Sequence, residues 1–172
     1  MDSFVALDFE TANRKRESAC SLAIVTVEKG KILETFHTFI RPPDNDYDIQ
    51  NIQVHGITPE ITEYANDFRV CFPEIYKRIK GKTIVAHNES FDRGVLRKAI
   101  EYYHIDASEL DLTQKWHCTY RLWKKVGLEP TTLKHCCEHF GIQLNHHDAI
   151  SDAEASAKLF VIYQYYLNQT KK

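Results

Sequence analysis

The stretch Phe4-Val5-Ala6-Leu7-Asp8-Phe9-Glu10-Thr11, near the start of the chain, decides the fold. Its apolar run from Phe4 to Phe9 predicts a short, buried β-strand. Asp8 and Glu10 are two residues apart, and side chains two apart on a strand point to the same face of the sheet. The stretch therefore predicts a strand that presents both carboxylates on one face.

Strand and helix patterns alternate along the rest of the chain. The segments Ala19–Glu28 and Ile32–Ile40 are expected to be strands joined by a turn at Glu28-Lys29-Gly30-Lys31, so that the first third of the chain forms an antiparallel meander. Beyond it we expect a loop at Asp44–Asn51, a short helix after Thr58-Pro59, a helix from Asp67 to about Lys80, a strand at Thr83–Ala86, a helix from about Ser90 to Tyr103, a fifth strand at Lys115–Cys118, and helices from Thr119, from Thr132 to Phe140 and to about Leu167. This order predicts an α/β fold with a mixed five-stranded sheet flanked by helices, the ribonuclease H-like arrangement.

The length of 172 residues and the apolar content of 43% are most simply explained by one compact domain over residues 1–172, with a core from about 4 to 167. No apolar run approaches the roughly 20 residues of a membrane span, and the N-terminus lacks the pattern of a secretion signal. We therefore expect a cytoplasmic protein without a membrane partner. The net charge of -2 argues against gripping long duplex nucleic acid by phosphate neutralisation alone, so any nucleic-acid binding should be local.

The chain contains 5 cysteines, an odd number, and no Cys-x-x-Cys pair, so we expect reduced thiols rather than a disulfide framework or a structural zinc site. His135 and His139 lie one helical turn apart beside Cys136 and Cys137, which leaves a soft metal site as an alternative. We favour an amphipathic helix with small buried cysteines and exposed histidines.

Two further acids, Asp92 and Asp152, lie near the beginnings of expected helices. Helix N-termini favour anions, so each of these acids taken alone is an ordinary first-turn residue. If the fold gathers them with Asp8 and Glu10, the crowded carboxylates raise one another's pKa unless cations neutralise them. Such a cluster of oxygen ligands calls for bound Mg²⁺ or Mn²⁺.

Three complete motifs, taken together, indicate a resemblance to a known family, which single acids cannot do. Asp8-Phe9-Glu10-Thr11, His87-Asn88-Glu89-Ser90-Phe91-Asp92 and His147-Asp148-Ala149-Ile150-Ser151-Asp152-Ala153 match, in order, the three motifs of the DEDDh branch of the 3′→5′ exonucleases. The chain is similar to the DnaQ-like proofreading (epsilon) subunits of bacterial DNA polymerase III, from residue 4 to about 165. His55-Gly56-Ile57-Thr58 resembles the family's segment near the substrate end. A local departure is Cys118-Thr119, where many relatives have Asp-Thr, but that position is not among the metal acids.

The resemblance implies a role for each matched acid and for the histidine. Asp8, Glu10, Asp92 and Asp152 would hold two Mg²⁺ or Mn²⁺ ions, and His147 would be the general base. Glu10 would also meet the terminal 3′-hydroxyl. The chemistry is consistent with the residue types, because an imidazole with an unperturbed pKa of about 6.5 can accept a proton from water near neutral pH. The product would be a nucleoside 5′-monophosphate.

Substrate contacts are expected around this centre at Phe9, Thr11, Arg14, His55 and Ile57. Aromatic and apolar side chains can stack on or wedge single-stranded bases without reading their sequence, although burial in the core is an alternative for each. We favour a core position for Phe91, an exposed loop position for His146, and a role in shaping the turn before Asp92 for His87 and Asn88. Basic residues near the acids are either phosphate contacts or solvated charges: Arg14, Lys15, Arg16, Arg93, Arg97 and Lys98.

Three functions are compatible with these motifs. The leading one is a metal-dependent 3′→5′ exonuclease that degrades single-stranded or frayed DNA, in proofreading or repair. The second is an exoribonuclease or oligonucleotide-trimming enzyme, since related enzymes use the same acids on RNA. The third is a non-catalytic module that docks on a polymerase or repair complex. Only a short polar tail follows Leu167, so we expect a free-standing enzyme or a subunit that docks through its globular surface.

Overall fold

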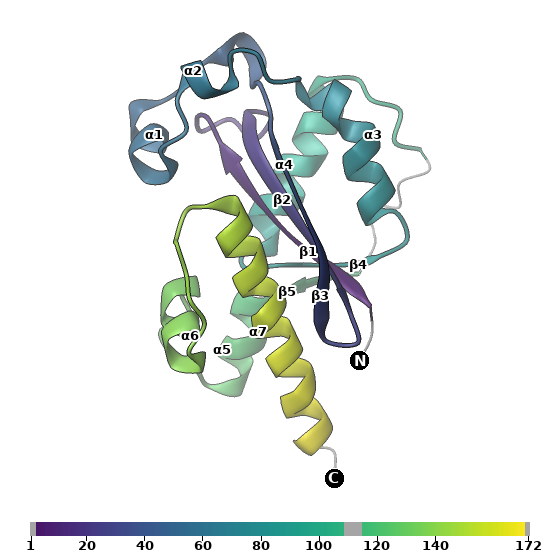
Figure 1. Ribbon diagram of the computed structural model, residues 1–172, viewed down its shortest axis with the longest axis vertical. Helices are drawn as coiled ribbons and strands as arrows, with labels where there is room; N and C mark the ends of the chain where they lie inside the picture. Colours follow the sequence, from purple (N-terminus) through teal and green to yellow (C-terminus); the bar gives the residue numbers. More distant parts are fainter. Residues whose placement is uncertain (1–2, 109–114, 171–172) are drawn as a thin grey trace.

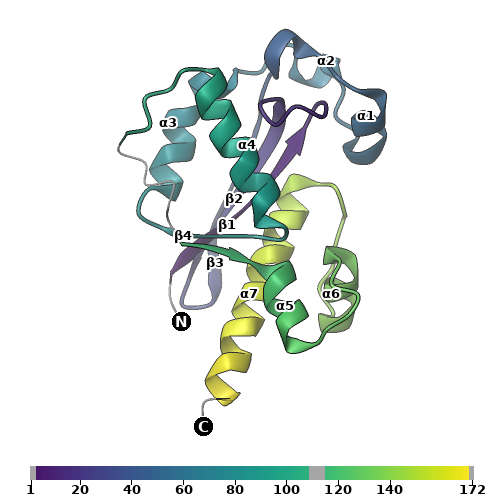
Figure 2. The same cartoon turned by 180° about the vertical axis from the view of Figure 1, so that it is seen from behind.

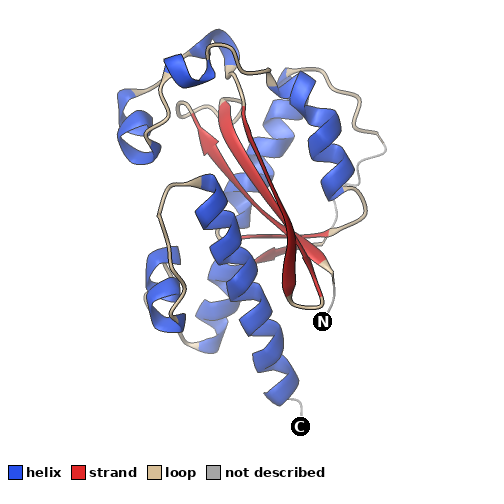
Figure 3. Ribbon diagram, in the orientation of Figure 1, coloured by secondary structure: helices blue, strands red, loops and turns tan. Residues whose placement is uncertain are grey.

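The computed structural model describes residues 3–108 and 115–170, and it contains a five-stranded mixed sheet between two layers of helices (Figures 1 and 3). The strands lie in the order β3-β2-β1-β4-β5. Their bounds are Phe4–Thr11 (β1), Ala19–Glu28 (β2), Lys31–Phe39 (β3), Thr83–Ala86 (β4) and Trp116–Cys118 (β5). The predicted α/β fold, with a mixed five-stranded sheet flanked by helices, is confirmed.

The first three strands form the expected antiparallel meander, while β4 and β5 run parallel to β1. The central strand β1 therefore pairs with β2 on one side and with β4 on the other. Its register with β2 shifts between Glu10 and Thr11, directly after the second acid of the strand. Such irregularities bend a strand and re-aim its side chains, and they are common beside active sites.

Alternate side chains of β1 face the two helical layers. Phe4 and Ala6 belong to the apolar cluster on the face covered by α7 (Ala149–Thr170), where the rings of Phe4 and Phe160 meet edge to face at 4.9 Å. The same layer includes α5 (Thr119–Val126) and α6 (Leu133–Phe140). Asp8 and Glu10 continue the row of Phe4 and Ala6 by the strand period of two, which directs both carboxylates to the side of the sheet on which α7 begins.

The opposite face of the sheet packs against α3 (Phe68–Ile79) and α4 (Glu89–Tyr102), as the view from behind shows (Figure 2). Val5, Leu7 and Phe9 provide the contribution of β1 to this second apolar cluster. α4 follows β4 directly, so its first turn lies at the carboxyl end of two parallel strands. This end of an open α/β sheet is where ligands usually bind.

The segment expected as a loop at residues 44–51 is partly helical, so that prediction was wrong. A 3-10 turn occupies Pro43–Asn45, and α1 spans Ile49–His55 before the expected short helix α2 (Pro59–Thr62). α1 ends at Gly56, whose φ of 73° is left-handed and whose N–H bonds to the carbonyl of Ile52 at 2.7 Å. Each residue of α1 stays at least partly exposed. The helix therefore lacks the buried apolar stripe by which sequence periodicity predicts helices.

The cysteines are free thiols, and Cys136 and Cys137 are buried beneath α7, as expected. Within residues 3–108 and 115–170, none of the helices combines the length and the apolar character required to cross a membrane.

Candidate active site

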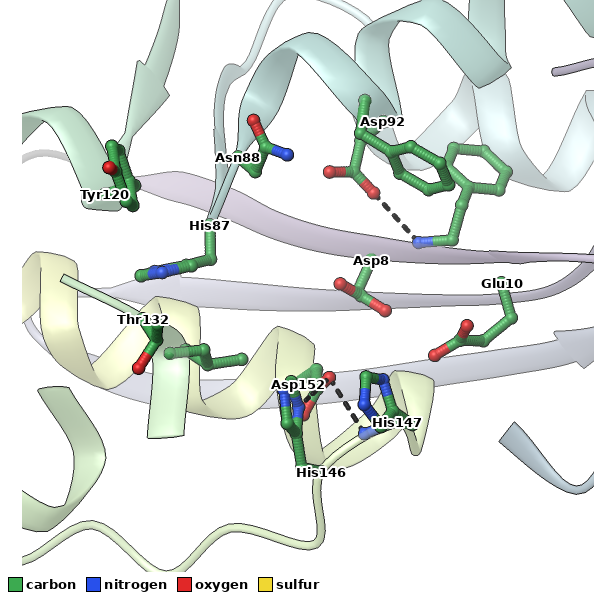
Figure 4. Close-up of a pocket in the computed structure, with 13 residues that line it drawn as sticks. Asp8, Glu10, His87, Asn88, Asp92, Tyr120, Thr132, His146, His147 and Asp152 are labelled. Atoms are coloured by element: carbon green, nitrogen blue, oxygen red, sulfur yellow. Dashed lines mark hydrogen bonds and ion pairs between the residues drawn. The ribbon is translucent and has the colours of Figure 1, made fainter. Parts of the chain in front are cut away.

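The four acids expected at the site line one cleft of ≈ 470 Å³ at the carboxyl ends of β1 and β4 (Figure 4). Asp8 and Glu10 extend from β1, Asp92 from the first turn of α4 and Asp152 from the first turn of α7. Carboxylate oxygens of Asp8, Glu10 and Asp152 lie within 4.8 Å of one another. The sheet and one helix from each layer thus bring together residues that are far apart in the sequence.

Asp92 is tied to β1 through the backbone between the first two acids. The Phe9 N–H donates to Asp92 Oδ1 at 2.9 Å, and Asp92 is buried. Burial raises the pKa of Asp92 to about 7, although the Phe9 hydrogen bond and the nearby Arg16 charge oppose the rise. This hydrogen bond links the first turn of α4 directly to the strand that carries Asp8 and Glu10.

Arg16 joins the loop after β1 to the same turn of α4. Its Nη1 donates to the carbonyl of Phe91 at 2.7 Å, and its guanidinium lies over the Phe91 ring at 4.8 Å. A Cβ at Gly94 would come within 3.0 Å of Arg16 Nη1. Glycine at this position therefore leaves room for the Arg16 side chain against α4. Arg16, expected as a candidate phosphate contact, is therefore also a brace for the helix that carries Asp92.

Asp152 is held by the loop that precedes α7. Its Oδ2 accepts hydrogen bonds from His146 Nδ1 at 2.9 Å and from the backbone N–H of His147 at 3.1 Å. His146 is exposed, as expected of a loop histidine, but its contact with Asp152 was not predicted. The two imidazole rings stack with centroids 3.9 Å apart, and burial together with His146 lowers the pKa of His147. The neutral form of His147 is thereby favoured beside the carboxylates.

The electrostatics of the cleft fit a divalent cation. Burial and then the neighbouring acids raise the pKa of Asp8 well above its usual value, and the same causes raise that of Glu10 to about 8. Burial also raises the pKa of Asp152, whose Oδ1 is buried without a hydrogen-bond partner among the described residues. Crowded carboxylates with a free buried oxygen supply the hard oxygen donors that Mg²⁺ and Mn²⁺ prefer.

His87 and Asn88 shape the turn between β4 and α4, as expected. Asn88 has a left-handed backbone with φ of 93°. His87 Nε2 donates to the carbonyl of Thr131 at 3.0 Å, and its Nδ1, the acceptor in a neutral ring, lies 2.9 Å from Thr119 Oγ1. Burial lowers the pKa of His87 to about 4. This neutral imidazole connects the end of β4 to the start of α5 and to the loop before α6.

The His87 bridge predicts a pH dependence of stability. Its pKa is about 4 in the folded protein and about 6.5 when unfolded, so its contribution is present above pH 6.5 and is lost as pH falls toward 4. We expect His87→Gln to flatten the decline of the unfolding free energy over this interval, by up to about 3 kcal/mol. Urea unfolding of both proteins in EDTA at pH 7.5, 6.5, 5.5 and 4.5 measures the effect. If the unfolding free energy fell equally with decreasing pH in wild type and variant, the proposed contribution of the His87 bridge would be contradicted.

The expected substrate contacts fall in different places. Phe9 lines the acidic cleft, whereas His55 and Ile57 line a second hollow of ≈ 330 Å³ that shares His146 and His147 with it. Thr11 lies outside the described lining of both hollows, and its carbonyl lies 3.1 Å from His55 Nε2. Thr11 therefore positions His55.

Arg14 is also outside both described linings. Its side chain is 85% exposed, and its Nε lies 3.6 Å from Asp48 Oδ2. Phe91, expected in the core, does pack against the second apolar cluster, but it is only partly buried and also lines the cleft, so that preference was only partly right. The cleft also includes Tyr120, Thr132 and Leu133, which belong to none of the motifs. In the sequence these three look like ordinary helix residues, so only the folded structure identifies them as part of the cleft.

Comparisons with known proteins agree with this architecture. The chain is 30% identical over 167 residues to the PolC-type DNA polymerase III of Bacillus subtilis, covering 93% of this chain and 11% of that protein. Exonuclease X in complex with 5′ overhanging duplex DNA has a TM-score of 0.77 at 22% identity, covering 96% of this chain and 93% of that one. Escherichia coli exonuclease I in complex with a dT13 oligonucleotide has a TM-score of 0.81 at 18% identity, covering 99% and 43%.

The two structural likenesses show the fold and confirm the predicted ribonuclease H-like arrangement. The chain spans about a tenth of the length of the curated relatives it matches, 12% and 11% in two of them. The model of the RNase_T exonuclease family matches residues 5–160, which includes all four acids and His147. The DnaQ-like resemblance is thus confirmed, and the chain belongs to the RNase_T family of exonucleases.

Proposed function

We propose that this protein is a metal-dependent 3′→5′ exonuclease that releases nucleoside 5′-monophosphates from single-stranded or frayed DNA. The observation that carries the proposal is the convergence of Asp8, Glu10, Asp92 and Asp152 in one cleft, with His147 beside Asp152. The family match supports hydrolysis of nucleic-acid ends.

The carboxylates of Asp8, Glu10, Asp92 and Asp152 would hold two divalent cations, Mg²⁺ or Mn²⁺. Bound cations would supply positive charge that stabilises the attacking and departing oxygens of a phosphoryl displacement. Cation binding would also relieve the mutual repulsion that raises the pKa of these acids.

His147 is the proposed general base. Its imidazole takes a proton from the water whose oxygen forms the new bond to phosphorus, while the bond from phosphorus to the upstream 3′-oxygen breaks. The departing 3′-oxygen takes up a proton from solvent, and His147 later returns its proton to solvent, which balances the hydrolysis. The hollow beside His147, lined by His55 and Ile57, would take the terminal nucleoside. Phe9, whose side chain is buried, would hold Asp92 in place through its backbone N–H. Thr11 would orient His55, and Arg14 would serve as an outer phosphate contact.

DNA is the proposed substrate in preference to RNA, with a role in proofreading or repair. Two structural neighbours are complexes with DNA, and the curated relatives are PolC-type DNA polymerases. We propose residues 1–172 as one exonuclease domain that associates with a polymerase or repair complex. The cytoplasmic location expected from the sequence stays a prediction.

The test is digestion of a 5′-labelled single-stranded DNA oligomer with Mg²⁺, beside an RNA oligomer of the same sequence. We expect a ladder that shortens from the 3′ end, faster on DNA, and no products in EDTA. Faster shortening of RNA would replace the DNA assignment with the exoribonuclease. An intact oligomer, with binding detected by anisotropy, would replace catalysis with the binding-module function.

A further inference from the structure

The cleft continues past the acids into a half that the reaction described above leaves unused. Its walls come from the end of β4 and from the beginnings of α5 and α6: His87, Asn88, Tyr120, Thr132 and Leu133. In Figure 4, Tyr120, His87 and Thr132 lie on the far side of Asp8 from Glu10, and His147 lies below Asp8, nearer to Glu10 than to Tyr120. The cleft thus has a His147 end and a Tyr120 end.

Tyr120 gives this half of the cleft a supported aromatic surface. It is partly buried in the first turn of α5, and its ring meets His87 edge to face at 6.0 Å. His87 is itself held at both ring nitrogens, so the support behind Tyr120 is rigid. Lys124, one turn further along α5, has its Nζ 5.8 Å from the centre of the Tyr120 ring. An aromatic ring beside a cation is the combination with which proteins bind single-stranded nucleic acids.

The geometry of the proposed reaction indicates which part of the substrate lies at the Tyr120 end. This step rests on the proposed function. In an in-line displacement, the attacking water and the departing oxygen lie on opposite sides of the phosphorus atom. His147 accepts the water's proton, so the water enters from the His147 end. The departing 3′-oxygen, which belongs to the upstream nucleotide, then points toward Asn88 and Tyr120.

We propose that Tyr120 forms the subsite for the base of the nucleotide immediately upstream of the scissile bond. The ligand is a nucleobase of any identity, because the ring offers a π surface and the surrounding Leu133 is apolar. Lys124 would contact a phosphate on the same strand. A base at this upstream position therefore contributes to turnover, whereas the remaining upstream bases contribute less.

The proposal is tested by removing the base from the substrate and the ring from the protein. Three 5′-labelled DNA oligomers are compared: one complete, one with an abasic residue second from the 3′ end, and one with an abasic residue fifth from that end. The first cleavage is followed under kcat/KM conditions. With wild type we expect the second-position lesion to slow cleavage about tenfold and the fifth-position lesion to have little effect. With Tyr120→Ala, the complete oligomer should be about tenfold slower and the second-position lesion should add nothing.

Two variants separate stacking from folding. Tyr120→Phe keeps the ring, so it is expected to retain the about tenfold effect of the second-position lesion that Tyr120→Ala loses. Tyr165→Ala removes an exposed tyrosine of α7, 13 residues or about 20 Å along the helix axis from Asp152, and should also match wild type. The subsite would be overturned if the second-position lesion still slowed Tyr120→Ala about tenfold. It would also be overturned if that lesion did not slow wild type. No cleavage by wild type would instead remove the proposed function and, with it, the basis of the subsite.

Discussion

Asp8→Asn is expected to reduce mononucleotide release more than about a hundredfold and, at the same time, to stabilise the protein in EDTA. The loss of activity follows because even groups that only orient metal ligands are worth 10- to 100-fold, and Asp8 is proposed as a ligand itself. The gain in stability follows because burial, and then Asp92 and Glu10, raise the pKa of Asp8. Asparagine has nearly the same shape and carries no charge.

The sign of this stability change depends on pH. The unfolded carboxyl ionises at about pH 4, whereas the folded one stays protonated to higher pH, so wild type in EDTA loses stability as pH rises through that interval. The advantage of Asp8→Asn should therefore be small at pH 4 and exceed about 1 kcal/mol at pH 8. Urea unfolding at both pH values measures it. Asp44→Asn is the matched control, since Asp44 is exposed and its φ of 56° suits asparagine.

The two readouts of Asp8→Asn can disagree in an informative way. Full release by the variant would contradict the metal-ligand role. Lower stability of the variant in EDTA at pH 8 would contradict the repulsion among the carboxylates, even if release were lost. Addition of Mn²⁺ should stabilise wild type more than the variant, because the variant lacks one of the anionic oxygens that bind it.

His147→Ala should lower kcat by about 10² to 10⁴, the usual contribution of a general base. Imidazole added to the buffer should partly restore the rate, because the removed ring leaves space beside Asp152. His146→Ala is the matched comparison, since the two rings stack and both residues hydrogen-bond Asp152, His146 through its ring and His147 through its backbone N–H. His146 donates its side-chain hydrogen bond to Asp152, so its loss should raise the Mn²⁺ concentration required while maximal kcat changes little. If imidazole restored the rate of His146→Ala but not that of His147→Ala, the general base would be His146 and the support of Asp152 would come from His147.

The acids could be placed from the sequence because local rules determine their positions. The strand period fixes Asp8 and Glu10 on one face, and helix beginnings fix Asp92 and Asp152. Their convergence required either the motif resemblance or the fold, since no local rule relates a strand to a helix some 80 or 140 residues later. The order of strands and helices was sufficient to predict the sheet.

Other features were beyond local patterns for physical reasons. α1 lacks a buried stripe, so its sequence signals are confined to its two ends, Asp48 before it and Gly56 after it. His146 acquires its neighbour through the loop before α7, and Tyr120 through the position of α5 beside the turn that follows β4. No spacing in the sequence encodes these contacts. Phe91 has the apolar character of a core residue, and only the folded structure shows that it also lines the cleft.

The proposed ligands come from the central strand and from one helix on each face of the sheet, with Asp92 on α4 and Asp152 on α7. A cation bound by all of them would connect the two helical layers across the end of the sheet. Detachment of either helix would then release the ion, so metal affinity and the cooperativity of unfolding should be two measures of the same equilibrium. Hydrogen exchange offers a local probe of that linkage: the Phe9 amide, bonded to Asp92, should become accessible to solvent only when α4 separates from β1.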